Sequence, residues 1–255
     1  MIRFRKMKHK SEVKVNDAHT YHQPGVLRVD ETSEQTKSFY NKIAGFYDTL
    51  SNRSEEPLRK AGLKMLHPEP GEQILEVGFG TGRSLVEIAR LVEPNGKVYG
   101  IDISEKMRKI AQQRARREHV EDMIDLSCGD ARNLPYEKGT MDGIFMSFTL
   151  ELFDTPDIIA MLNECKRVLK TGGRIVVVGM SRVCPEKLRT RMFEWVHRHF
   201  PHYFDCRPIF VRQALEDAGF KIAEGKIKKM WADVEVVCGI KNPEKKSEVN
   251  QKLNE

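Results

Sequence analysis

Three glycines at every second position constrain the fold more than any other feature of this chain. A short apolar run that contains Glu76 leads directly into Gly78, Gly80 and Gly82. Glycine adopts positive φ angles that other residues avoid, and its missing side chain lets a ligand approach the backbone closely. The pattern therefore predicts a buried strand, a turn that binds a ligand, and a helix that begins at Arg83.

Apolar runs and amphipathic segments alternate from residue 72 to residue 180. The strand-like runs span residues 74–77, 97–102, 123–128, 141–148 and 174–179. Such alternation is typical of a parallel sheet that is covered by helices on both faces. Residues 220–229 and 231–240 are predicted to form two further strands, joined as a hairpin. The chain is therefore predicted to have an α/β fold.

A second acidic residue lies where the ribose of a nucleotide would need it. Asp102 ends the run at 97–102 and comes 20 residues after Gly82. A carboxylate at this position can accept hydrogen bonds from both ribose hydroxyls. A dinucleotide-binding loop would carry another glycine where this chain has Arg83. A nicotinamide-dependent dehydrogenase is therefore the rival interpretation, and the sequence disfavours it.

With Glu76 at the strand end, the glycine loop resembles motif I of the class I S-adenosylmethionine-dependent methyltransferases. Asp130, after the run at 123–128, matches the acidic residue that meets the adenine amino group in this family. Motifs in the family's order extend over about residues 36–240. The resemblance implies a Rossmann-like, doubly wound sheet of seven strands in the order 3-2-1-4-5-7-6, with the last strand antiparallel. It also implies a helical lid insertion at about residues 181–219.

The same resemblance implies S-adenosylmethionine as the cofactor and assigns the residues that bind it. Gly78 and Gly80 would offer backbone amides to its methionine end, and Asp102 would bind its ribose. Ile103 would flank the adenine, and Asp130 would meet the adenine edge. The full predicted set is Tyr47, Glu76, Gly78, Gly80, Gly82, Asp102, Ile103, Asp130, Ala131 and Ser147.

An amphipathic helix is predicted to begin at Thr32 or Ser33. Its residues 39–48 resemble the front helix of the ubiquinone and menaquinone C-methyltransferases, in which a Tyr-Asp pair ends a helix that lies over the cofactor. Tyr47 and Asp48 match this pair. Plain core packing explains the apolar spacing of such a helix as well, and for Tyr47 both interpretations stay open.

Methyl transfer from a sulfonium needs alignment and the exclusion of water more than a catalytic side chain, so no obligatory catalytic residue is expected. An acceptor that must lose a proton needs a base within hydrogen-bond reach. Glu151 follows the fourth strand, where relatives often carry a histidine, and is the first candidate for this base. A carboxylate at the surface or at a helix start is the competing interpretation. Tyr47 and Tyr203 are the other candidate contacts to the acceptor.

His197, His199 and His202 with Cys206 have the residue types of a metal site. However, two rings in a His-x-His pattern on one helix point about 200° apart. We therefore expect solvated or lid-facing histidines and no metal. The five cysteines are scattered, without a Cys-x-x-Cys pair, which is typical of free thiols in a reducing cytoplasm.

The net charge of +6 is concentrated at the two ends of the chain. Residues 1–14 carry a net charge of +5, residues 241–255 carry +1, and residues 15–240 are neutral. We expect residues 1–31 to be a basic, disordered arm, residues 32–240 to form the methyltransferase domain, and the segment after 240 to be a charged tail. A neutral folded body disfavours a nucleic-acid substrate.

No apolar run approaches the roughly 20 residues of a membrane span, and no hydrophobic stretch of a secretory signal follows the basic start. We therefore expect a cytoplasmic protein. A helix predicted at residues 186–200 has an apolar face opposite an arginine face. That face could contact a membrane surface peripherally, but a lid packed on the domain is the favoured interpretation.

The sequence thus predicts a methyltransferase that acts on a small, apolar or lipid-like acceptor. Aromatic residues of the front helix and of residues 181–207 would line the acceptor pocket. Residues 80–85 and 200–208 also resemble bacterial phospholipid N-methyltransferases, so a phosphatidylethanolamine-type acceptor is an alternative. A non-catalytic module that only binds S-adenosylmethionine is another. The identity of the acceptor, the methylated atom and the oligomeric state are left open.

Overall fold

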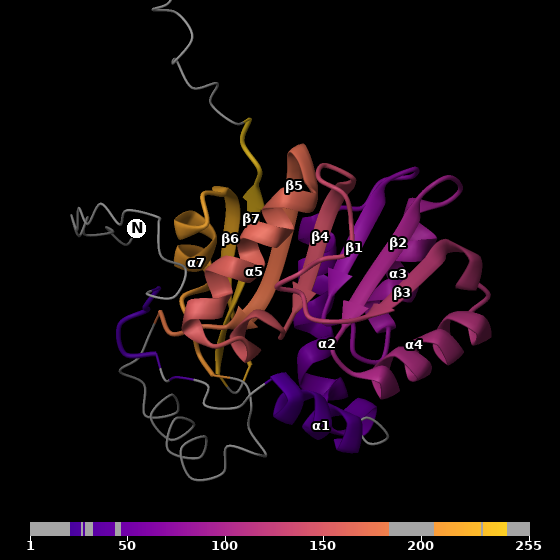
Figure 1. The fold of residues 1–255 in the computed structure, drawn as a ribbon, viewed down its shortest axis with the longest axis horizontal. Coiled ribbons are helices and arrows are strands. Elements are labelled where there is room, and N and C mark those ends of the chain that lie inside the picture. Colours follow the sequence, from indigo (N-terminus) through magenta and orange to yellow (C-terminus); the bar gives the residue numbers. More distant parts are fainter. Residues whose placement is uncertain are drawn as a thin grey trace, which may run out of the picture.

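The computed structural model describes residues 21–26, 28, 33–43, 47–183, 207–230 and 232–243. These residues form one sheet of seven strands in the order β3-β2-β1-β4-β5-β7-β6 (Figure 1). The strands are β1 (Gln73–Val77), β2 (Lys97–Asp102), β3 (Ile124–Cys128), β4 (Met141–Ser147), β5 (Leu169–Met180), β6 (Lys221–Lys229) and β7 (Asp233–Ile240). β1 to β5 are parallel, and β7 runs antiparallel to β5 and β6. The predicted strand order and antiparallel last strand are confirmed.

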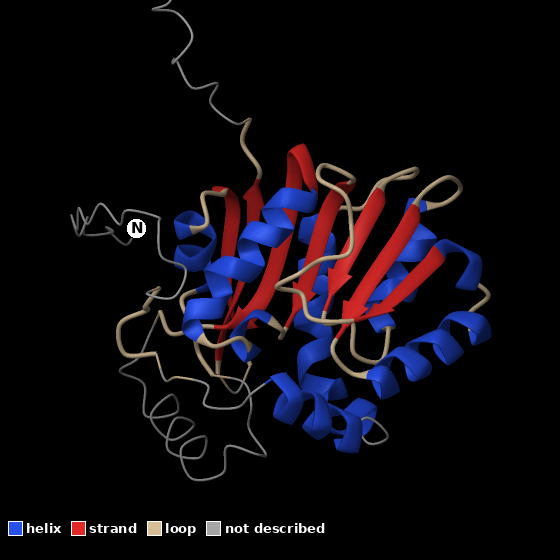
Figure 2. Cartoon of the chain, in the orientation of Figure 1, coloured by secondary structure: helices blue, strands red, loops and turns tan. Residues whose placement is uncertain are grey.

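Helices cover both faces of this sheet (Figure 2). They are α1 (Ser33–Ile43), α2 (Tyr47–Leu66), α3 (Arg83–Val92), α4 (Glu105–Arg117), α5 (Thr155–Val168) and α7 (Val211–Asp217), with the short 3₁₀ helices η2 (Glu121–Met123) and η3 (Leu150–Leu152). Buried side chains of α2, α3 and α4 form one core cluster with one face of the sheet. Those of α5 and α7 form a second cluster with the opposite face. The fold is therefore doubly wound, as the resemblance implies.

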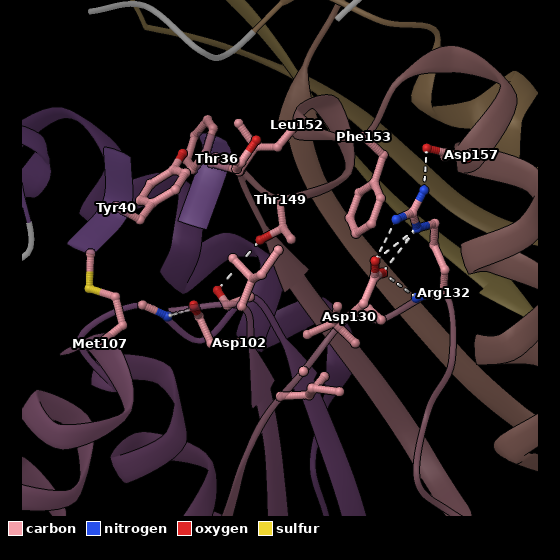
Figure 3. A pocket seen from close by; sticks show the side chains of 18 of the residues that line it. Thr36, Tyr40, Asp102, Met107, Asp130, Arg132, Thr149, Leu152, Phe153 and Asp157 are labelled. Carbon is pink, nitrogen blue, oxygen red and sulfur yellow. Dashed lines mark hydrogen bonds and ion pairs between the residues drawn. The ribbon is translucent and has the colours of Figure 1, made fainter. Parts of the chain in front are cut away.

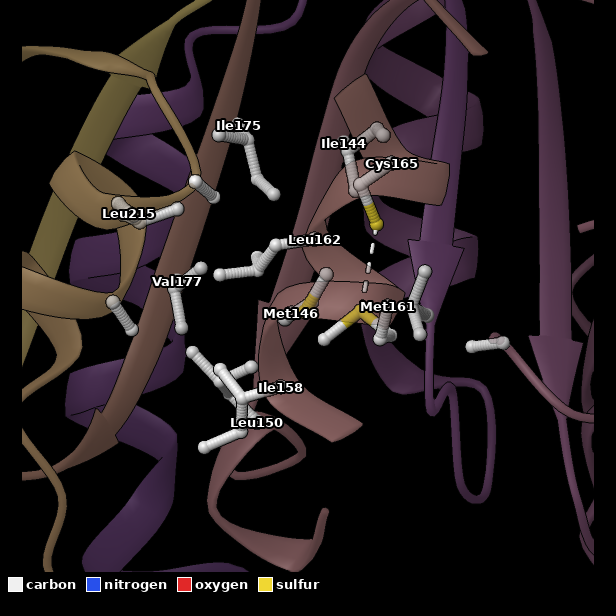
Figure 4. Close-up of a cluster of buried hydrophobic side chains, with 14 of the residues drawn as sticks. Ile144, Met146, Leu150, Ile158, Met161, Leu162, Cys165, Ile175, Val177 and Leu215 are labelled. Atoms are coloured by element: carbon white, nitrogen blue, oxygen red, sulfur yellow. Dashed lines mark hydrogen bonds between the residues drawn. The ribbon is translucent and has the colours of Figure 1, made fainter. Parts of the chain in front are cut away.

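The central strands are mostly apolar because they are buried on both faces. Successive side chains of a strand point to opposite faces. Val177 of β5 belongs to the cluster under α5, where Leu162 and Met146 also lie (Figure 4). Its neighbour Val176 belongs to the cluster under α2. Because helices cover both faces of the sheet, a ligand can bind at the edge formed by the carboxyl ends of the strands.

The region before β1 differs from the prediction that Tyr47 ends the front helix. In the structure α1 ends at Ile43, and Tyr47 begins the separate helix α2. The sequence pattern does not reveal α2, because Pro57 lies inside it and interrupts the helical signal. Burial of Leu58 and Leu66 against the sheet stabilises this helix instead. Tertiary packing therefore overrides a weak local pattern here.

Residues 21–26, which belong to the predicted arm, pack against the domain. The Gln23 side chain is fully buried, donates to the Phe210 carbonyl at 3.0 Å and accepts from the Phe210 N–H at 3.1 Å. It thereby pairs the Phe210 N–H at the start of α7 and adds a second donor to the Phe210 carbonyl, which also accepts from the Ala214 N–H. Arg28 follows with a 2.6 Å ion pair to Asp154. Specific polar contacts, and not apolar periodicity, hold this segment in place.

Several predictions fall outside the described residues. They concern residues 1–20, the helix at 186–200, Tyr203, His197, His199, His202, Cys206 and residues 244–255. Of the lid insertion, the structure describes a bridge between Ser181 and Ile209 and the helix α7. The domain boundaries stay predictions. Among the described residues, no helix is long and apolar enough to cross a membrane.

Candidate functional site

The turn after β1 has a backbone geometry that glycine adopts without strain. Gly78, Gly80 and Gly82 have φ angles of 71°, 53° and 80°. The N–H of Gly78 donates to the Ile101 carbonyl at 2.8 Å and ties the turn to β2. A Cβ atom on Gly78 would lie 2.4 Å from Thr149 Cγ2, whereas a Cβ atom on Gly80 would meet nothing within 4 Å. Gly78 thus packs against the turn after β4, and Gly80 leaves open space beside the turn. The prediction that both glycines offer free amides to the methionine end is wrong, because the Gly80 N–H donates to Asp102 and the Gly78 N–H to Ile101.

A pocket opens beside this turn, at the carboxyl ends of β1 to β4 (Figure 3). Its empty volume is about 940 Å³, including the part that is open to solvent. The predicted cofactor residues that line it are Gly78, Gly80, Asp102, Ile103, Asp130, Ala131 and Ser147. The fold therefore brings seven of the ten predicted residues into one pocket, at the edge where open α/β sheets bind ligands. Their binding roles stay predictions.

Of the other three predicted cofactor residues, Gly82 and Glu76 are not part of the pocket lining. Gly82 is the N-cap of α3, and a Cβ atom there would lie 3.0 Å from the Ala111 Cα, so it serves the packing of α3 on α4. Glu76 is buried beneath the turn. The side chain of Tyr47 is outside the described part of the structure.

Asp102 ends β2 with its carboxylate held by two backbone groups. Oδ2 accepts from the Gly80 N–H at 2.9 Å, and Oδ1 accepts from the Ser104 N–H at 2.8 Å. Burial raises the pKa of Asp102 to about 6, although both hydrogen bonds favour the charged form. A carboxylate oxygen can accept more than one hydrogen bond. The side chain is therefore fixed in place and still able to accept ribose hydroxyls.

Asp130 forms an ion pair inside the pocket that sequence reasoning missed. Arg132 donates to Asp130 Oδ2 through Nε at 3.0 Å and through Nη2 at 2.6 Å. Its Nη1 donates to Asp157 at 2.7 Å, as Figure 3 shows. Burial opposes ionisation, but the bonds from Arg132 outweigh it and lower the pKa of Asp130. The spacing Asp130-x-Arg132 is the local signal that could have indicated this pair.

The front helix α1 crosses the pocket and contributes Thr36 and Tyr40 to its lining. Asn41, on the same helix, accepts from the Ser104 hydroxyl at 2.8 Å and from the Lys106 N–H at 3.2 Å. These two bonds attach α1 to the N-terminus of α4, where backbone N–H groups lack helical partners. Because Ser104 also binds Asp102, α1 is connected to the predicted ribose site. Nothing in the local sequence pattern indicates this attachment.

Glu76 is a buried acid with one oxygen, Oε2, that has no partner among the described residues. Burial raises its pKa to about 8, against a hydrogen bond from Ser84 and the charge of Arg59. Arg59 comes from α2 and donates to Glu87 of α3 at 2.5 Å. The acid therefore lies at a junction of β1, α2 and α3, directly below the glycine turn.

The pocket wall after β4 is mainly apolar and partly strained. Phe148 lines it. Thr149, Leu152 and Phe153 line it as well (Figure 3). Phe148 has a φ angle of 53°, a conformation that costs a non-glycine residue about 1–2 kcal/mol. Strain of this kind is concentrated at functional sites. This wall is suited to a flat, apolar acceptor.

Glu151, the first candidate base, lies behind this wall and not in the pocket. It is fully buried; Oε1 accepts from the Met180 N–H at 3.1 Å, and Oε2 has no partner among the described residues. Arg207 is also buried and donates through Nη2 to the Phe153 carbonyl oxygen. Sequence reasoning did not single out Arg207.

The described residues contain no group of three or more His, Cys, Asp or Glu side chains that could hold a metal ion. The histidines and the cysteine for which a metal was considered lie outside them. The expectation of no metal therefore stays a prediction.

Known proteins resemble this chain over most of its length. The model of the ubiE/COQ5 methyltransferase family matches residues 28–205. A demethylmenaquinone methyltransferase of Symbiobacterium thermophilum is 31% identical over 176 residues, which are 68% of this chain and 69% of the relative. A protein of the same name from Lactococcus lactis subsp. lactis is 34% identical over 152 residues, 58% of this chain and 59% of that relative. The second match thus spans less than two thirds of the relative.

A solved structure gives the same result for the fold. The SAM-dependent methyltransferase from Aquifex aeolicus superposes with a TM-score of 0.58 and covers 77% of this chain and 97% of its own, at 23% identity. These findings confirm the class that the motifs predict, together with its cofactor. They give no support to phospholipid N-methylation.

Proposed function

The chain belongs to the ubiE/COQ5 methyltransferase family, and we propose that it methylates a ring carbon of a quinol that carries a lipid-like tail. It is a class I methyltransferase that uses S-adenosylmethionine. The observation that carries the proposal is the family match over residues 28–205. The two bacterial relatives described above are named for methylation of demethylmenaquinone. The quinol acceptor is inferred from the names of these relatives, and it is this acceptor that we propose for the present chain.

The residues of the pocket fit the cofactor. Gly80 leaves open space where a side chain would stand, Asp102 offers a carboxylate for ribose hydroxyls, and Asp130 lies at the end where the adenine is predicted. When bound, the cofactor supplies a methyl group on a positively charged sulfur. The protein has to hold the acceptor in line with that methyl group and to exclude water.

The wall after β4 supports an aromatic acceptor. Phe148, Leu152 and Phe153 present apolar surface to the pocket, and Tyr40 of α1 adds a ring from another element. Flat aromatic rings stack well on such side chains. A phosphate-bearing head group would need cationic partners, and Arg132 is already paired with two carboxylates. A quinol ring therefore suits the described lining better than a phospholipid head group.

The proposal is tested with the full chain and methyl-labelled S-adenosylmethionine. Separate reactions receive reduced demethylmenaquinone, phosphatidylethanolamine or no acceptor, each in detergent. Label in the quinol fraction alone supports the proposal. Label in phosphatidylethanolamine would replace it with the alternative, and cofactor binding without transfer to any acceptor fraction would favour the non-catalytic module.

A matched pair of variants links turnover to this pocket. Asp102→Asn should lower turnover at limiting cofactor, because it removes the charge and replaces one accepting oxygen by an amide NH₂ group that can only donate. Asp125→Asn, on the exposed strand β3, should leave turnover unchanged, since its only described ion pair is a 3.9 Å contact with Lys97.

A further inference from the structure

Two buried charged side chains with unsatisfied atoms lie directly behind the acceptor wall. Oε2 of Glu151 and both Nε and Nη1 of Arg207 have no hydrogen-bond partner among the described residues. Glu151 is 0% exposed and Arg207 is 1% exposed. An unsatisfied buried polar atom costs about 1–3 kcal/mol, and more when it is charged. Their concentration at one place therefore indicates a site that a ligand completes.

Contacts of the two residues place them at the wall. Leu152 and Phe153, which follow Glu151 in the chain, line the pocket, and Arg207 donates to the Phe153 carbonyl oxygen. Gly179 of β5 leaves room for the carboxylate, because a Cβ atom there would lie 3.1 Å from Glu151 Oε2. The pair is thus held between η3 and β5, one layer from the pocket.

The unsatisfied atoms comprise an acceptor on Glu151 and two donors on Arg207. A ring hydroxyl satisfies both sides, since it donates one hydrogen bond and accepts others. We propose that Glu151 and Arg207 bind a hydroxyl of the acceptor ring, with Glu151 as the base that takes its proton and Arg207 as the cation that stabilises the resulting oxyanion. This inference rests on the proposed function, because it requires a quinol acceptor.

The step balances in atoms and charge. The hydroxyl proton moves to Glu151 and leaves a phenolate, whose ring carbon forms the new C–C bond as the S–CH₃ bond breaks and its electron pair stays on sulfur. The methylated ring then releases its C–H proton to water and becomes a phenolate again. Glu151 returns its proton to that oxygen. The net products are the methylated quinol, the thioether and one proton.

The electrostatics of the pair suit this role. Burial raises the pKa of Glu151 to about 7, which lies in the range of an effective base at neutral pH. Burial also lowers the pKa of Arg207 to about 10, and each of the two charges opposes the shift of the other. Three other charged groups act on the pair. Glu55 of α2 raises the pKa of Glu151, Asp154 raises the pKa of Arg207, and Arg28 lowers the pKa of Arg207.

Access to the pair requires the wall to move. Leu152 and Phe153 separate Glu151 from the pocket, so the acceptor must displace at least one of these side chains. Leu152 is the last residue of η3, and Phe153 lies in the connection from η3 to α5. The backbone adjusts more easily in such a connection than within a strand.

The decisive variant is Glu151→Gln, which keeps the shape of the side chain and removes the base. With reduced demethylmenaquinone as acceptor, kcat should fall about 100-fold or more, while the affinity for S-adenosylhomocysteine stays within about twofold. The matched control is Glu235→Gln. Glu235 is a buried carboxylate of β7 that pairs with the end of β5, but its Oε2 already accepts from the Ser181 hydroxyl and from the Val211 N–H, each at 3.1 Å. The control should keep kcat within about threefold.

The pH profile separates a base from a structural role. Wild-type kcat should rise as pH increases through about 7, because Glu151 must be ionised to act. Glu151→Gln should lose this rise. A variant with wild-type kcat and an unchanged profile overturns the inference.

A binding measurement provides a readout that does not depend on turnover. A nitro-substituted naphthol, whose ionised form absorbs visible light, is titrated with the protein in the presence of S-adenosylhomocysteine. Wild type should bind it in the ionised form at a lower pH than Arg207→Gln does, and equal ionisation in both proteins counts against the inference. If wild type methylates a different acceptor and not the quinol, the proposed function fails. If it methylates the quinol but Glu151→Gln is unaffected, only the present inference fails.

Discussion

The two halves of the site are built in different ways. On the cofactor half, the carboxylate of Asp102 has a backbone partner for each oxygen, and Asp130 is paired with Arg132. On the acceptor half, Glu151 and Arg207 are more deeply buried and still have unsatisfied atoms. The cofactor half can bind its ligand with groups that the fold already holds in place. The acceptor half instead keeps charged atoms that, in the proposed function, only the acceptor would satisfy. Substitutions in the cofactor half should therefore mainly change the shape of the site and the cofactor affinity. Substitutions in the acceptor half should mainly change the rate of methyl transfer.

The largest effect is expected at Gly78. A Cβ atom there would lie 2.4 Å from Thr149 and the φ angle of 71° would be strained, so Gly78→Ala should lower cofactor affinity by about 100-fold or more, on the order of 3 kcal/mol. Gly80→Ala has strain but no clash, and about tenfold is expected. Calorimetry with S-adenosylhomocysteine measures both. Equal losses at the two glycines would contradict the packing argument.

Asp102→Asn tests the fixed carboxylate and should weaken cofactor binding by about 30-fold, the loss of one charge-assisted hydrogen-bond set. The wild-type affinity should also fall as pH drops below about 6, because protonation of Asp102 removes an acceptor. The variant should not show this pH dependence. If the wild-type affinity for the cofactor is constant from pH 5 to pH 8, the role assigned to the Asp102 carboxylate in the cofactor half is wrong.

Glu76→Gln should raise the stability of the fold at alkaline pH and lower the cofactor affinity. The folded-state pKa of about 8 lies above the ordinary value of 4.5, so the stabilisation from this group is complete below about pH 4.5 and is lost as pH rises through 8. Because Gln cannot ionise, the variant should be more stable than wild type at pH 8.5 by about 2 kcal/mol and similar at pH 5. Its cofactor affinity should fall about fivefold. Denaturant unfolding at the two pH values decides this, with Glu137→Gln as the exposed control.

The smallest effect is expected where α1 meets α4. Asn41→Ala leaves the Lys106 N–H and the Ser104 hydroxyl without this partner and should weaken cofactor binding by about threefold to tenfold, roughly 1 kcal/mol. Hydrogen exchange in α1 should increase while exchange in the sheet does not. Lys42→Ala, an exposed change on the same helix, serves as the control. Unchanged exchange in α1 would show that Asn41 does not hold the helix in place.

Much of the cofactor half could be predicted from the sequence because its determinants are local. A glycine turn after an apolar strand, and an acidic residue at the end of the next strand, are close in the chain and have one structural solution. The alternation of strands and helices, with the family resemblance, likewise indicated the sheet order. The same reasoning failed for α2, where Pro57 breaks the pattern and packing against the sheet stabilises the helix.

Only the tertiary structure decided which distant side chains meet. Arg207 reaches the Phe153 carbonyl across 54 residues of chain, and Asn41 reaches Ser104 across 63. Gln23 pairs with Phe210, although the segment around it has no apolar pattern. Such contacts depend on where strands and loops converge, and no periodicity of a single segment encodes that. The sequence by itself therefore determined the class of enzyme and its cofactor, while the burial that leaves Glu151 and Arg207 unsatisfied arises from the packing of η3, β5 and α2, which is a property of the whole fold.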